Sequence, residues 1–68
     1  MKVSKHFTLR QQERGITDKE VIQCVMHGVR LTNRTDANKY TIVDNTTGVM
    51  VVTDKALTTL ITTFRKGV

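Results

Sequence analysis

A seven-residue segment that starts at Gly15, Gly-Ile-Thr-Asp-Lys-Glu-Val, constrains the fold of this chain more than any other. The glycine predicts the end of a helix, because glycine takes the left-handed conformation after a helix without steric cost. Thr17 and, three residues later, Glu20 match a capping box, in which each side chain binds the other residue's backbone N–H. Ile16 and Val21 have the spacing of a hydrophobic staple. The segment therefore predicts that one helix ends at Gly15 and a second begins directly after Thr17.

The two predicted helices carry unequal apolar faces. The first covers roughly Lys5–Arg14, with Ser4 as its N-cap, because a serine hydroxyl accepts a backbone N–H of the first turn. Its apolar stripe is thin, with Phe7 as the main anchor, so most of its surface is polar. The second helix ends at Gly28 and has the stronger apolar face. The residues of that face are Val21, Ile22, Cys24, Val25 and Met26.

The rest of the chain has the composition of strands. Three segments rich in β-branched residues are separated by turn sequences, namely Val29–Arg34, Lys39–Asp44 and Val49–Thr53. The last segment, Leu57–Lys66, has two interpretations. Its apolar residues fall at i, i+3, i+4 and i+7, which favours a helix, whereas its four threonines favour a strand. We expect a single α+β domain over residues 1–68, with two N-terminal helices packed on a three- or four-stranded antiparallel sheet.

Composition narrows the class of partner. Eleven Lys and Arg residues oppose six Asp and Glu residues, giving a formal net charge of +5, which favours an anionic partner and nucleic acid first. Cys24 is the only cysteine, so an intramolecular disulfide and a cysteine-rich metal site are excluded, and a reducing compartment is favoured. The chain has no signal-peptide pattern and no apolar stretch long enough to span a membrane. We therefore expect a cytoplasmic protein without a membrane partner, a metal or another cofactor.

The first helix carries a row of residues suited to a phosphodiester. His6, Arg10 and Arg14 are spaced four apart, so they lie within about an 80° sector of a helix. Arginine binds phosphate oxygens through two N–H groups, and histidine transfers a proton near neutral pH. Metal-free RNA cleavage needs those two roles, because the 2′-hydroxyl is itself the nucleophile. The alternative is a solvated helix face, and the spacing alone does not separate the two.

Four other positions have a structural and a chemical interpretation each. His27 is either a cation at a helix C-terminus or a general base. Cys24 is either a buried core thiol or the nucleophile that His27 would activate. Tyr40 is either a core residue or a stacking platform for a base. Arg65 either binds a phosphate or belongs to a solvated end of the last strand.

The pattern Ser4-x-His6-x3-Arg10-x3-Arg14-Gly-Ile-Thr, followed by a helix that ends at a glycine, resembles a small bacterial and phage domain family. Members of that family open with Ser-x-His-Ala and continue with Glu-Arg-Gly-Ile-Ser. The Val-Val strand and the final Thr-x-Tyr/Phe strand of the family correspond to Val51-Val52 and to the segment that starts at Thr62. The family is grouped with the RelE/ParE-like and BrnT-like toxin superfamily.

The resemblance implies that the last segment is a strand and that the chain is one RelE/BrnT-like domain. It also implies a site. Ribonucleases of the superfamily cleave RNA without a metal, using His, Arg or Lys, and hydroxyl groups, whereas other members act by binding proteins. By position, His6 and Thr62 would be catalytic. The residues expected to bind RNA or its phosphates are Arg10, Arg14, Arg65 and Tyr40.

We therefore expect a protein that binds RNA rather than DNA, with toxin-type, metal-independent endoribonuclease activity as the sharper form of that expectation. An antitoxin or a host protein is then a further partner. The rival is a non-catalytic, phage-type effector or inhibitor that occupies a host protein or nucleic acid through its basic face. A homodimer formed by pairing edge strands is a third alternative.

Overall fold

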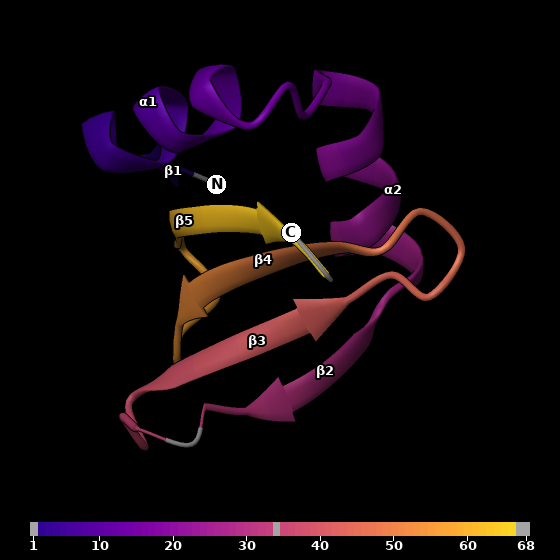
Figure 1. Ribbon diagram of the computed structural model, residues 1–68. Coiled ribbons are helices and arrows are strands. Elements are labelled where there is room, and N and C mark those ends of the chain that lie inside the picture. The colour runs from indigo at the N-terminus through magenta and orange to yellow at the C-terminus, as the bar shows by residue number, and fades with distance from the viewer. Residues whose placement is uncertain (1, 34, 67–68) are drawn as a thin grey trace.

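Two helices lie on one face of a five-stranded sheet in the computed structural model, which describes residues 2–33 and 35–66 (Figure 1). In chain order the elements are β1 (Lys2–Val3), α1 (Lys5–Glu13), α2 (Asp18–His27), β2 (Val29–Thr32), β3 (Lys39–Val43), β4 (Val49–Asp54) and β5 (Thr59–Arg65). The strands are ordered β1-β5-β4-β3-β2 across the sheet. The α+β class and the two N-terminal helices are confirmed.

The expected three- or four-stranded antiparallel sheet is wrong in strand number and in direction. Lys2 and Val3 pair with Thr59 and Leu60 in parallel, so β1 adds a fifth strand and makes the sheet mixed. The other neighbouring strands pair antiparallel. A two-residue strand is too short for a recognisable pattern of alternating apolar and polar residues. Its pairing depends on backbone groups, which sequence patterns do not report.

The segment from Leu57 to Lys66 contains a strand and not a helix. β5 begins at Thr59, and Leu57 lies in the preceding turn with a φ of 60°. Asp54 holds that turn, because its carboxylate accepts the backbone N–H groups of Thr58 (2.7 Å) and Thr59 (3.0 Å). The Thr58 hydroxyl also donates to this carboxylate. That bond, followed by the bond from the Thr59 N–H, holds the pKa of Asp54 below its usual value.

The junction between the helices has the predicted geometry. Gly15 has a φ of +62°, and the N–H groups of Gly15 and Ile16 bond to the carbonyls of Gln12 and Gln11, which is the Schellman arrangement. The Thr17 side chain accepts the N–H of Glu20, and the Glu20 side chain accepts the N–H of Thr17. The capping box and the glycine stop therefore both form.

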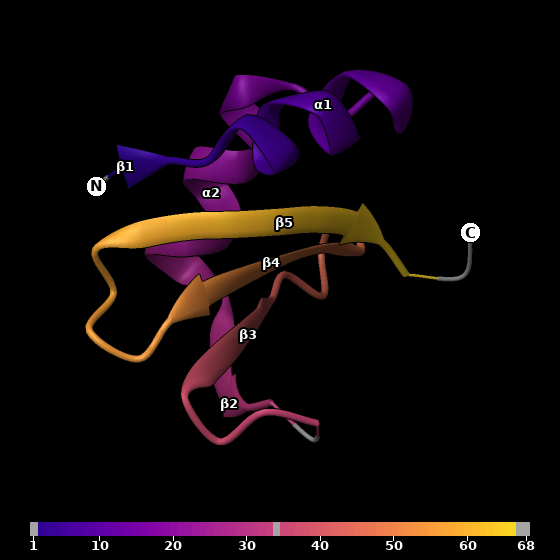
Figure 2. The same cartoon turned by 90° about the vertical axis from the view of Figure 1, so that its left-hand side faces the viewer.

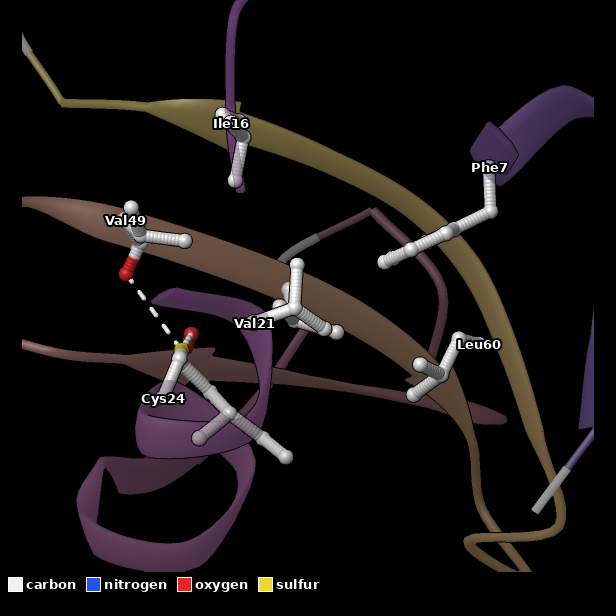
Figure 3. Packing of buried hydrophobic residues seen from close by; sticks show 8 residues of the cluster. Phe7, Ile16, Val21, Cys24, Val49 and Leu60 are labelled. Carbon is white, nitrogen blue, oxygen red and sulfur yellow. Dashed lines mark hydrogen bonds between the residues drawn. The ribbon is translucent and has the colours of Figure 1, made fainter. Parts of the chain in front are cut away.

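The core lies between the helices and the sheet (Figure 3). Its buried hydrophobic members are Phe7, Ile16, Val21, Cys24, Ile42, Val49, Val51 and Leu60. Because side chains alternate along a strand, the residues that follow Val49 and Val51 point to the opposite face, which neither of the two described helices covers.

Gly28 ends α2 without the left-handed conformation that Gly15 adopts. Its φ is −73°, which any residue adopts. A Cβ at this position would lie 2.5 Å from the Cys24 carbonyl oxygen and 2.7 Å from Cγ2 of Ile42. The glycine therefore allows α2 to approach β3 closely.

Within residues 2–33 and 35–66, neither helix has the length or the apolar content needed to cross a membrane.

Candidate nucleic-acid interface

Helix α1 is bound at both ends to the outer edge of β5. The Ser4 hydroxyl accepts the N–H of Phe7 (3.0 Å) and donates to the carbonyl of Ile61 (2.9 Å). At the other end, Nη1 of Arg14 donates to the carbonyl of Thr63 (2.8 Å). Figure 2 shows α1 lying along β5, beyond the short stretch that β1 covers. Ser4 and Arg14 thus supply hydrogen bonds to an edge that would otherwise face solvent.

The predicted basic row runs along α1, and its last member, Arg14, turns toward β5. His6 and the neighbouring Lys5 are exposed. Arg10 forms an ion pair with Glu13 at 2.7 Å, and both side chains are more than one-third exposed, at 35% and 46%. Such an exposed pair contributes little to stability, so a phosphate can replace Glu13 as the partner of Arg10 at little cost. Arginine has five N–H donors, and Arg14 uses one of them in its bond to Thr63, which orients the guanidinium.

Arg65 is held by an acidic partner rather than left free for a phosphate. Its guanidinium contacts both carboxylate oxygens of Glu20 (3.0 and 3.2 Å) and the carbonyl of Thr47 (3.2 Å). The Arg65 hydrogen bond, followed by the Thr17 backbone bond, lowers the pKa of Glu20 to about 2. The capping box is the one role that the sequence pattern predicts for Glu20. No local pattern links residues that are 45 positions apart.

Thr62 points away from the helices. It pairs directly with Val52, whose side chain is on the face opposite to that of Val51. Thr63 points toward the helices instead, and its buried hydroxyl donates to the carbonyl of Met50 (2.9 Å). Thr62 therefore does not face the helix layer to which His6 belongs.

Tyr40 lies on β3, separated from α1 by β4 and β5 in the sheet. Its ring packs beneath Arg30 of β2, whose Cζ lies 5.2 Å from the ring centroid. Tyr40 is therefore remote from the basic row. No sequence pattern points to Arg30, because it lies beside Tyr40 only through the pairing of β2 with β3.

Cys24 is a core thiol, as one of the two interpretations predicted. Its side chain is fully buried, with Sγ 3.3 Å from the carbonyl oxygen of Ile42 and 3.4 Å from that of Val49 (Figure 3). Burial, with a smaller contribution from the charge of Asp44, raises the pKa of the thiol to about 11. His27 is exposed at the end of α2, so it does not share the environment of the thiol. Among the residues that the structure describes, no three His, Cys, Asp or Glu side chains come together as metal ligands.

Searches of the chain against known protein families, curated proteins and solved structures found no match.

Proposed function

We propose that this chain is an RNA-binding protein and that the exposed side of α1 is its contact surface. The observation that carries the proposal is the row of His6, Arg10 and Arg14, with Lys5 beside it, on a helix fixed to the sheet at both ends. Cations on a rigid element bind a phosphate backbone with less loss of backbone freedom than cations on a loop. The net charge of +5 supports the same class of partner.

One feature favours binding over cleavage. Thr62, which was predicted to act with His6, points away from the helix layer. Binding needs only the cations of α1, whereas acid–base cleavage needs a second group positioned with His6. Membership of the RelE/BrnT-like superfamily, and toxin-type endoribonuclease activity with it, is the narrower form of this proposal.

The binding experiment measures the affinity of the purified protein for single-stranded RNA over a range of salt concentrations. Each lost phosphate contact should reduce the slope of log affinity against log salt by about 0.7. We expect Arg10→Glu to weaken binding and to flatten this slope. Lys55→Glu is the matched control, because it makes the same change in net charge in the turn between β4 and β5. Equal losses for the two variants would show that α1 is not the contact surface.

The cleavage experiment uses induced expression in cells and gel analysis of RNA with the purified protein. Toxicity and RNA cleavage that disappear in His6→Ala would establish the endoribonuclease. Toxicity that survives in His6→Ala but disappears when Arg10 and Arg14 are both replaced by Glu would establish binding as the activity. A circular dichroism spectrum of each variant checks that the fold is retained, since Arg14 also binds β5.

A further inference from the structure

The two edges of the sheet differ in how they are closed. β5 is flanked by β1, Ser4 and Arg14, whereas β2 forms the opposite edge and all four of its residues are exposed (Figure 1). An exposed edge strand presents unpaired N–H and C=O groups that another strand can bind. Of the two outermost strands, β2 with four residues offers a longer edge for added backbone pairing than β1 with two.

The register shows which backbone groups of β2 point outward. The N–H of Asn33 bonds to the carbonyl of Lys39, so this pair belongs to the hydrogen-bonded set of the β2–β3 ladder. Hydrogen-bonded and non-hydrogen-bonded pairs alternate along an antiparallel ladder. Val29 and Leu31 therefore bond to β3, and Arg30 and Thr32 direct their N–H and C=O groups away from it.

A cavity lies next to this edge on the helix side of the sheet. Its volume is about 300 Å³, and it is lined by Val25, Gly28, Arg30, Ile42 and Leu57. Arg30 is the one charged residue in the lining, and it has no ion-pair partner among residues 2–33 and 35–66. A cation at the rim of an apolar cavity suits a side chain with an apolar stem and an acidic end.

We propose that the edge of β2 binds an extended, acidic peptide of another protein as an added antiparallel strand, with a glutamate facing Arg30. The N–H and C=O groups of Arg30 and Thr32 would bond to the backbone of the added strand. The glutamate methylenes would cover the mouth of the cavity, and the carboxylate would pair with Arg30. Its neighbours in the peptide would point to the other face, beside Val29 (53% exposed) and Leu31 (51% exposed). The register thus specifies a peptide that alternates apolar and acidic residues.

A second copy of this chain is a poorer occupant of the same edge. Pairing β2 with itself around Leu31 would place Arg30 opposite Thr32 of the other copy, so both arginines would lie diagonally on one face. Each copy also carries a net charge of +5. Like charges at this distance oppose association, whereas an acidic peptide is attracted.

The test uses a short blocked peptide of alternating valine and glutamate, and the same peptide with lysine for glutamate. Fluorescence anisotropy should show about tenfold tighter binding of the glutamate peptide to the natural chain. Arg30→Glu should reverse this preference, and Arg30→Ala should abolish it. Lys19→Glu, which makes the same change in net charge at an exposed position of α2, should retain it. Hydrogen exchange should slow at the amides of Arg30 and Thr32 on binding and stay unchanged at Leu31.

Three results would overturn the proposal. One is a peptide preference that Arg30→Glu leaves unchanged while its circular dichroism spectrum remains native. Another is peptide-induced protection at amides outside β2. The third is a dimer in analytical ultracentrifugation whose Arg30 and Thr32 amides are already protected without peptide. None of these readouts involves RNA, so the outcome is independent of the proposed function of α1.

Discussion

Replacing Ser4 by alanine tests the attachment of α1 to β5. The substitution removes an N-cap, which costs about 1 kcal/mol, and a hydrogen bond to the Ile61 carbonyl, which costs about 1 kcal/mol more. The free energy of unfolding should therefore fall by about 2 kcal/mol. For a domain of this size such a loss lowers the melting temperature by roughly 8–16 °C. Urea unfolding followed by far-ultraviolet circular dichroism measures it, provided that the m-value is unchanged.

Two further variants separate the cap from the attachment. Ser4→Asp keeps the acceptor for the Phe7 N–H but has no donor for Ile61, so it should lose about 1 kcal/mol. Thr17→Ala removes the N-cap of α2. The Thr17 hydroxyl bonds to Glu20 and not to a strand carbonyl, so this variant should also lose about 1 kcal/mol of unfolding free energy. A Ser4→Asp variant as stable as the natural chain would show that the bond from Ser4 to the Ile61 carbonyl contributes nothing to stability.

Three other outcomes follow from burial and charge. Phe7→Ala should lose about 3–5 kcal/mol, enough to unfold most of a small domain in a thermal melt, whereas exposed Leu9→Ala should change stability by about 0.5 kcal/mol or less; similar losses for both would contradict the assigned core. Cys24 should stay unreactive toward a thiol reagent in the native state and react in urea, and rapid native labelling would disprove its burial. The pKa of Glu20 in the folded chain, about 2, is below the ordinary 4.5, so its contribution to stability is present above pH 4.5 and is lost as the pH falls toward 2. Unfolding midpoints at several pH values should show that Glu20→Gln loses this dependence. Parallel curves for the variant and the natural chain would count against the pair with Arg65.

Features that depend on neighbouring residues were predictable from the sequence. Gly15, Thr17 and Glu20 determine the helix junction through backbone geometry and bonds that span a few residues, so their order in the chain is sufficient. The buried thiol followed from its apolar neighbours on α2. The conflict over the last segment was not resolved by its own residues, because threonine and leucine patterns pointed in opposite directions.

Features that depend on strand pairing were not predictable. The row of His6, Arg10 and Arg14 was recognised from helical spacing, but the bond from Arg14 to Thr63 requires β5 to lie beneath α1. The orientation of Thr62 depends on register, since a shift of one residue sends a side chain to the other face. The pair of Glu20 and Arg65 arises in the same way, from elements that meet only in the folded chain.

The dependence of α1 on β5 sets an order for folding as the chain leaves the ribosome. A nine-residue helix with one buried side chain is too short to persist alone. Its supports, Leu60 and the carbonyls of Ile61 and Thr63, are synthesised near the end of the described chain. Helix α2, β3 and β4 can dock earlier, because all the residues through which they contact one another precede β5 in the chain. The first helix to be synthesised is thus the last to become stable, and it stays accessible to chaperones and proteases until β5 has emerged.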